Sequence, residues 1–342
     1  MLFYAIMSVW TDLLATAVLS PSPHNVQPWR VRVLDDDEAD LFIDSARTLP
    51  KEDTTGSFII LTMGIFIEAL RLLAENRGLT LEYQTYHEPS WYAAEILRTQ
   101  KQTFFPFARL QLKSESNVPS TIDPAIFLKR RTSRISLKPD PIPDGDVEQL
   151  KSLARAWDQR FEVITNRDTI ERILNKNTEA VFEDLNNRAY HDEIVEWFRF
   201  SDKKSKATRD GLDYRCMNTS RTAFWLSARM PRLLQLPLTS SLLAKVYRSQ
   251  LGEVTTIGML AGDFWPAESA FKNGSLLMRF WLETARLNLY IHPYGNLVTN
   301  KTASTWLFEE TGVAGIWLIF KIGYSDVPPE SYRRSVEEIL LA

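Results

Sequence analysis

The chain has a single cysteine, Cys216, among its 342 residues. One thiol excludes an internal disulfide, a cysteine-rich metal site and a CxxC redox pair, and it is typical of a reducing compartment. Apolar runs are short as well, and none reaches the roughly 18 residues that a membrane-spanning helix needs. The apolar residues 1–10 lack the basic segment and cleavage site of a signal peptide, so we interpret them as the lead-in to a helix at Val9–Leu19. We therefore expect a cytoplasmic protein without membrane contact.

Phosphate-binding glycine motifs and excess positive charge are also missing. The chain has neither GxGxxG after a strand nor GxxxxGK[ST], which argues against a Rossmann dinucleotide fold and a P-loop. Its 40 basic and 43 acidic residues give a net charge of -3, so a general nucleic-acid surface is not expected. The four histidines are scattered without the spacing of metal ligands, so no metal site is expected.

The chain does contain enough apolar material for a large core. Hydrophobic residues make up 44% of the sequence, including 10 Trp and 18 Phe, and the length exceeds one typical domain. A long apolar helix is predicted at about Gly56–Asn76. A linker with two prolines follows at Asn117–Pro124. We therefore expect two domains, residues 1–125 and 126–342.

An internal repeat connects the two predicted domains. Gly64–Tyr83 aligns with Gly274–Pro293, and at the same offset Thr103–Leu112 aligns with Val313–Ile322. Gly78 then falls on Asn288, the two residue types that most readily adopt the left-handed conformation at a helix end. Each half is therefore predicted to form a long helix followed by two strands.

The early parts of the halves align at a different offset, which indicates an insertion. Trp29–Leu34 resembles Arg160–Thr165, so the second half carries extra residues after Thr165. We place a lid-like insertion at about residues 199–255, because so long an extra segment is more often functional than neutral.

Two polar clusters are complementary between the halves. The loop Pro21–Trp29 packs three prolines and four hydrogen-bonding side chains into nine residues, and Arg130–Arg134 contains three arginines. The second half has no copy of the loop, and the first has no copy of the arginine cluster. The loop could be a rigid turn and the arginines a solvated basic face. Together, however, they predict an intrachain pseudo-dimer with one composite site.

These clusters resemble the signatures of a known family. Pro21-Ser-Pro-His-Asn-Val-Gln-Pro-Trp29 resembles the PSxxNxQPW loop of the nitroreductase superfamily, and Arg130-Arg-Thr-Ser-Arg134 resembles its RRSxR segment, with Thr132 in place of Ser. The two halves and the insertion resemble the Acg-like branch, and Thr208–Leu212 is a weaker match to that branch. The resemblance implies an α+β, nitroreductase-like fold of two tandem repeats, with antiparallel-rich central sheets flanked by helices.

The resemblance also implies a flavin mononucleotide (FMN) site. Arg134 would be the cation near flavin N1 and O2, and a backbone amide at Tyr294 or Gly295 would approach N5. Arg130, Arg333 and Arg334 would hold the phosphate, which arginines bind bidentately. Ser22, Asn25 and Gln27 would bond the ring edge or the ribityl chain, or cap the local turn. His24 is expected to be structural or to contact the ribityl chain. The predicted cofactor-binding set is Pro21, Ser22, Pro23, His24, Asn25, Gln27, Arg130, Arg131, Thr132, Arg134, Pro293, Tyr294, Gly295, Arg333 and Arg334.

The function implied is hydride transfer from NAD(P)H through FMN to electron-poor acceptors such as nitroaromatics or quinones. The alternative is a protein that sequesters FMN beneath the insertion with little turnover. A third interpretation is a scaffold that binds no flavin. We expect small-molecule ligands and a monomeric pseudo-dimer or weak homodimer.

Overall fold

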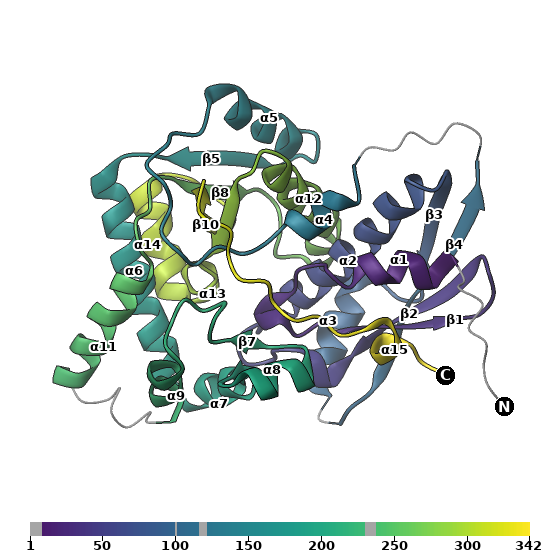
Figure 1. The fold of residues 1–342 in the computed structure, drawn as a ribbon, viewed down its shortest axis with the longest axis horizontal. Coiled ribbons are helices and arrows are strands. Elements are labelled where there is room, and N and C mark those ends of the chain that lie inside the picture. The colour runs from purple at the N-terminus through teal and green to yellow at the C-terminus, as the bar shows by residue number, and fades with distance from the viewer. Residues whose placement is uncertain (1–8, 100, 116–121, 230–236) are drawn as a thin grey trace. The chain divides into compact units, whose positions relative to one another are not determined.

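The computed structural model describes residues 9–99, 101–115, 122–229 and 237–342. They form two compact units, and each unit contains segments that are distant in sequence (Figure 1). Unit 1 consists of Met1–Lys129, Trp265–Arg279 and Arg333–Ala342, and unit 2 of Arg130–Phe264 and Phe280–Tyr332. Two later segments thus join the N-terminal part of the chain in unit 1. The predicted division into domains 1–125 and 126–342 stays a prediction. The predicted lead-in before Val9 and most of the predicted linker 117–124 fall outside the described residues.

Unit 1 is built on a four-stranded antiparallel sheet in the order β1-β2-β4-β3. Trp29 at the start of β1 is fully buried and stacks on Phe66 of the long helix α2, with ring centroids 4.6 Å apart. Helix α2 packs against β3 and α1. The elements are α1 (Val9–Ala17), β1 (Trp29–Val33), β2 (Glu38–Asp44), α2 (Ser57–Glu75), β3 (Leu79–Thr85), α3 (Pro89–Arg98), β4 (Phe104–Ser114), α4 (Ala125–Lys129) and α15 (Val336–Ile339).

Helix α2 is apolar around most of its circumference because it forms the centre of unit 1. It begins after Gly56, whose φ is 71°, and the Asp53 carboxylate accepts the Ile59 N–H at 3.0 Å. From the sequence we expect no segment of this kind, but among the described residues α2 is long and apolar enough to cross a membrane. Of that apolar window, 89% is buried inside the structure. Burial on nearly all sides accounts for its composition.

Helix α12 (Ala267–Arg286) begins in unit 1 and continues into unit 2. Its Gly274 approaches Gly64 of α2 within unit 1. A Cβ on Gly64 would lie 2.2 Å from the Phe271 carbonyl oxygen, and one on Gly274 would lie 2.4 Å from the Leu61 carbonyl oxygen. Only glycine permits so close an approach of the two helix backbones.

Unit 2 contains a second four-stranded antiparallel sheet, in the order β5-β8-β10-β9. Phe161, Phe280 and Phe320 pack together in its core. Its strands and the helices nearest to them are α5 (Asp144–Arg155), β5 (Arg160–Ile164), β8 (Ile257–Ala261), β9 (Tyr290–Pro293), α13 (Asn296–Thr299), α14 (Lys301–Thr311) and β10 (Ile316–Gly323).

A mainly helical segment separates β5 from β8, where the sequence predicts an insertion. The predicted range 199–255 covers the later part of this segment, and its residues 230–236 fall outside the described chain. Asp184 near the end of α6 accepts hydrogen bonds from Asn296 and Asn300, at 2.7 and 2.9 Å, which tie α6 to α13 and α14. The elements are α6 (Arg167–Asn186), α7 (Arg188–Glu196), β6 (Phe198–Arg199), α8 (Asp202–Thr208), β7 (Leu212–Asp213), α9 (Arg221–Arg229) and α11 (Pro237–Gln250).

The α+β class with antiparallel sheets and flanking helices is confirmed. So is the prediction for the two helix ends, since Gly78 has a φ of 70° and Asn288 a φ of 59°. The strand order is the same in both sheets once the strands are counted along each half. The tandem repeat and the pseudo-dimer stay predictions.

Candidate functional site

The loop Pro21–Trp29 connects α1 to β1 in unit 1 and has an unusual backbone. His24, Asn25 and Gln27 have φ values of 46°, 56° and 54°, in the left-handed region that residues other than glycine rarely adopt. Each such residue costs roughly 1–3 kcal/mol unless the surroundings compensate, and such conformations cluster at functional sites. The loop is therefore held in its shape by its contacts.

Gln27 is the residue that fixes this shape. Its side chain is fully buried; Oε1 accepts the backbone N–H of Arg334 at 2.9 Å, and Nε2 donates to the Asn25 carbonyl at 3.3 Å. Its own N–H donates to Ser22 Oγ at 3.0 Å. Both ends of the Gln27 amide thus bond within the chain, one to a neighbour in the loop and one to a residue 307 positions away.

Other loop residues are more accessible. Ser22, Pro23 and His24 are partly exposed, whereas Pro21 and Asn25 are buried. His24 Nε2 lies 2.6 Å from Glu52 Oε2. The partly exposed residues are the ones that a ligand can reach without displacing the core.

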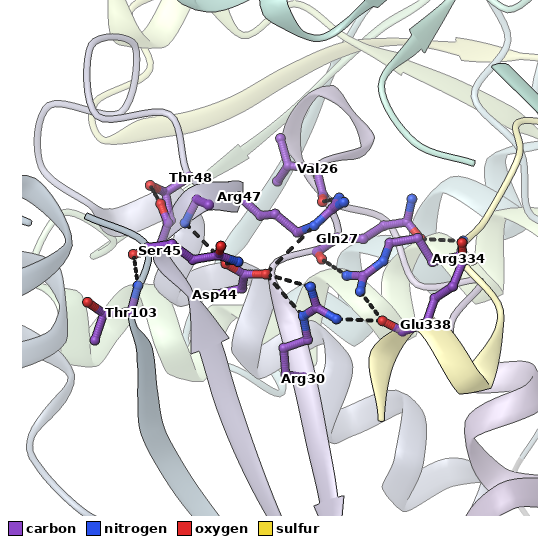
Figure 2. Close-up of polar contacts among 12 residues, drawn as sticks. Val26, Gln27, Arg30, Asp44, Ser45, Arg47, Thr48, Thr103, Arg334 and Glu338 are labelled. Carbon is purple, nitrogen blue, oxygen red and sulfur yellow. Dashed lines mark hydrogen bonds and ion pairs between the residues drawn. The ribbon is translucent and has the colours of Figure 1, made fainter. Parts of the chain in front are cut away.

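Three arginines gather beside this loop in unit 1 (Figure 2). Arg30 Nη2 lies 2.9 Å and Arg47 Nε 3.8 Å from the buried Asp44 Oδ2, and Arg47 also donates to the Val26 carbonyl at 2.9 Å. Arg334 is buried and donates to the carbonyls of Gln27 and Glu338. Burial and the cations Arg47 and Arg30 lower the pKa of Arg334 to about 9. The structure thus brings the predicted Arg334 to the predicted loop, together with Arg30 and Arg47, which sequence reasoning missed. Arg333 precedes this cluster and is partly exposed.

In unit 2, the start of the segment Arg130–Arg134 runs alongside β9. Thr132 forms an isolated parallel bridge with Ile291, and the Ser133 N–H donates to the Ile291 carbonyl at 3.1 Å. Arg130 is buried, with its guanidinium carbon 4.9 Å from the ring centroid of Trp281. Arg131 donates to the Pro328 carbonyl at 2.9 Å and pairs with Glu330. These contacts fix the backbone that carries Arg134.

Arg134 lies in a polar cluster with His292 and Tyr294, whose rings are 5.1 Å apart. Arg134 Nη1 donates to the Cys216 carbonyl at 3.1 Å. Within the described part of the chain, Arg134 Nε, His292 Nδ1 and Tyr294 Oη are buried without a hydrogen-bond partner. Buried polar atoms rarely stay unbonded, because desolvating them costs free energy. The set therefore fits a polar ligand that bonds to a cation, an imidazole and a phenol.

The pKa values of His292 and Tyr294 are both shifted strongly in the direction that favours the neutral side chain. Burial, with the cations Arg134 and Lys321, holds the pKa of His292 well below its usual range. Burial raises the pKa of Tyr294 well above 10. At neutral pH the imidazole is therefore neutral and the phenol keeps its proton, while Arg134 supplies positive charge.

The resemblance implies that a backbone amide at Tyr294 or Gly295, in the loop after β9, would approach the flavin. The Tyr294 N–H donates to the Ile319 carbonyl at 2.8 Å as part of the sheet edge. Pro293 pairs with Phe320, and Gly295 precedes α13. The Tyr294 amide is thus already bonded, which leaves Gly295 as the backbone group of this pair for a ligand.

Sequence reasoning missed Lys321 and Tyr247, which interact electrostatically with Arg134, and Asn177, which donates a hydrogen bond to Tyr247. Lys321 on β10 is fully buried, and burial together with Arg134 lowers its pKa to about 7. Asn177 of α6 donates to the Tyr247 hydroxyl of α11 at 3.4 Å. Burial raises the pKa of Tyr247, with Asn177 and Arg134 acting in the opposite direction. A lone lysine within the apolar run Trp317–Ile322 was the available signal for Lys321; Asn177 and Tyr247 carried none.

No family model matches the chain. Among curated proteins it is 27% identical over 194 residues to "Putative NAD(P)H nitroreductase acg" of Mycobacterium tuberculosis, a match that covers 55% of each. It is 24% identical over 191 residues to "Putative NAD(P)H nitroreductase Rv3131" of the same species, covering 54% of this chain and 49% of that protein. The match thus spans about half the length of these curated relatives.

Solved structures give a distant likeness of shape. The FMN-dependent nitroreductase NfnB of Mycobacterium smegmatis, in complex with NADPH, is 15% identical with a TM-score of 0.36, covering 60% of this chain and 92% of that one. A BluB-like flavoprotein of Clostridium difficile is 13% identical with a TM-score of 0.38, covering 63% and 95%. Both curated relatives are named as nitroreductases, and the Pro21–Trp29 loop and the Arg130–Arg134 segment of this chain resemble signatures of the nitroreductase superfamily.

Proposed function

We propose that the chain binds FMN and acts as an oxidoreductase of nitroreductase type. The observation that carries this proposal is the cluster in unit 2, where Arg134 Nε, His292 Nδ1 and Tyr294 Oη are buried and have no hydrogen-bond partner among the residues that the structure describes. Bound flavin would supply the hydride chemistry, while the protein orients it and tunes its charge.

The residues of the cluster suit the polar edge of a flavin. Arg134 provides a fixed cation where negative charge would develop on reduction. Tyr294 holds a proton at Oη, and His292 is a neutral donor or acceptor at Nδ1. In unit 2, the other proposed FMN contacts are Arg130, Arg131, Thr132, Pro293 and Gly295. In unit 1, the proposed FMN contacts are Arg333, Arg334 and the loop residues Pro21–Asn25. We assign Gln27 to shaping the loop.

The relatives' names guide the choice of donor and acceptor. We propose NADPH or NADH as the hydride donor and nitroaromatics or quinones as acceptors. A planar donor would bind over the flavin, leave after oxidation and be replaced by the acceptor, which predicts ping-pong kinetics.

The visible spectrum of the purified full chain tests flavin binding, and anaerobic titration with NADPH or NADH tests reduction. We expect a yellow protein whose flavin absorbance bleaches with at least one donor. Arg134→Ala removes one charge-assisted contact of about 1.5–3 kcal/mol, so FMN should bind roughly 10- to 150-fold more weakly. Arg188→Ala, at a side chain that is 94% exposed on α7, is the matched control. A colourless protein that does not take up added FMN would refute the proposal.

A second candidate function is FMN storage with little turnover. Tyr247, from the segment between β5 and β8, interacts electrostatically with Arg134, and Asn177 of the same segment donates a hydrogen bond to Tyr247. A segment held there would hinder a donor. Bound flavin that neither NADPH nor NADH reduces would favour this candidate.

A further inference from the structure

The Arg134 segment is bonded to the chain that leaves α11. The Leu137 N–H donates to the Glu253 carbonyl at 2.8 Å, and Asn218 Nδ2 lies 3.3 Å from the carbonyls of both Arg134 and Gln250. Residues 134–137 and 250–253 therefore run against each other. We call these two stretches the clamp.

Gly252 makes this approach possible. Its φ is 68°, and a Cβ at this position would lie 2.5 Å from Ser136 Oγ and 2.9 Å from Ser136 Cα. No larger residue fits there without moving the two stretches apart. The clamp is thus a close backbone contact.

Lys321 joins both sides of the clamp from the sheet beneath. It lies on β10 opposite Ile257 of β8 and His292 of β9. Its Nζ donates to the Ile135 carbonyl at 2.6 Å and to the Leu251 carbonyl at 3.0 Å, one from each stretch. Among the described residues it has no carboxylate partner, so these carbonyls are what compensate the buried amine.

The positive charge of the nearby Arg134 makes it costly to bury the Lys321 amine. Arg134 lies close enough to disfavour a second cation, and His292, from the paired strand, is held neutral by both. A buried lysine without an acidic partner is rare in a merely structural role. Lys321 bonds to the carbonyl of Ile135, the residue that directly follows Arg134, which indicates that Lys321 helps to hold Arg134 in position.

We propose that Lys321 is a positioning residue that locks the end of α11 to the Arg134 segment and thereby fixes Arg134 for the flavin. This inference rests on the proposed function for its link to FMN. The lock itself concerns the chain alone.

Amide hydrogen exchange on the flavin-free full chain tests the lock. Lys321→Met keeps the length of the side chain and removes both donated hydrogen bonds. We expect faster exchange in residues 134–137 and 250–253 together, with little change in β1–β4 of unit 1. Lys245→Met, at an exposed position of α11, is the control and should leave exchange unchanged. Unchanged exchange in Lys321→Met would overturn the lock.

FMN titration and the midpoint potential of the bound flavin test the positioning role. In Lys321→Met we expect FMN binding to weaken about tenfold, as for one lost charge-assisted contact, and the potential to become more negative. Lys321→Gln, which keeps one donor, should restore part of the affinity. Faster exchange with unchanged affinity and potential would overturn the positioning role. If the unmodified chain binds no FMN, the proposed function fails, and the exchange result still decides on the lock.

Discussion

Several ionisable side chains in this protein are removed from water, and their local chemistry follows from that. Burial raises the pKa of Asp53 to about 6 and lowers that of Lys321 to about 7. Both shifts favour the neutral form, as desolvation requires. Each residue also bonds backbone: Asp53 accepts an N–H of α2, and Lys321 donates to two carbonyls. Stability and site geometry should therefore depend on pH.

Asp53 gives the clearest pH prediction. Its folded pKa of about 6 exceeds the usual 3.8, so between these values the folded chain binds more protons than the unfolded chain. The free energy of unfolding should fall as the pH rises from 4 to 6, by up to about 1.4 kcal/mol per pH unit from this group. Asp53→Asn retains an acceptor for the Ile59 N–H and lacks the titration. Urea denaturation of both proteins at pH 4, 5, 6 and 7 measures the difference; parallel profiles would contradict it.

Sequence reasoning proposed candidate site residues where a local motif marks them. The Pro21–Trp29 loop and Arg134 stand out because proline, amide and arginine patterns are visible in short windows. Arg30, Arg47 and Lys321 were missed because their roles depend on neighbours that are distant in sequence. For Gln27 the sequence left a ligand contact and local turn capping open. Its bond to Arg334, 307 residues away, is not visible in any short window.

At the scale of elements, helix bounds were largely predictable. The apolar pattern places α2 at about Gly56–Asn76, and the helix runs from Ser57 to Glu75. Its left-handed end at Gly78 has a local cause in the residue type. The sequence alone did not show that α12 contributes to two units, because that depends on tertiary packing along its length.

The crossing of α2 and α12 makes a prediction at this scale. Gly64→Ala would place Cβ 2.2 Å from the Phe271 carbonyl oxygen, a contact with backbone that cannot turn aside. The helices would have to separate, which should destabilise the protein by roughly 1–3 kcal/mol, the usual cost of overpacking. Gly145→Ala in α5, where a Cβ meets nothing within 4 Å, is the control and should be neutral or slightly stabilising. Equal denaturation midpoints for both variants would show that the crossing tolerates a methyl group.

At the scale of the whole molecule, the C-terminal segment shows what pattern analysis cannot supply. Leu340 forms a parallel bridge with Val31 at the edge of the unit 1 sheet, and Arg334 bonds Gln27. The segment thus completes unit 1 although it is farthest from it in sequence. The antiparallel α+β class was predictable from helix and strand periods, but this return of the chain was not.

The two proposed functions, turnover and storage, differ in whether the segment between β5 and β8 shields bound flavin. Its Tyr247 approaches Arg134, packs near Phe182 and accepts from Asn177. If this segment shields bound flavin, loss of the phenol ring should open a path for a reductant. The neighbouring Val246 is exposed on the same helix, so its truncation should not.

Stopped-flow reduction by NADPH measures the difference in the flavin-loaded chain. We expect Tyr247→Ala to be reduced several-fold faster than the unmodified protein, with Val246→Ala unchanged, because access to a covered site limits the rate. Iodide quenching of flavin fluorescence should rise in the same variant, which separates access from a change in donor binding. Fast reduction of the unmodified chain, with no further gain in Tyr247→Ala, would contradict a shielding role and favour an enzyme that turns over freely.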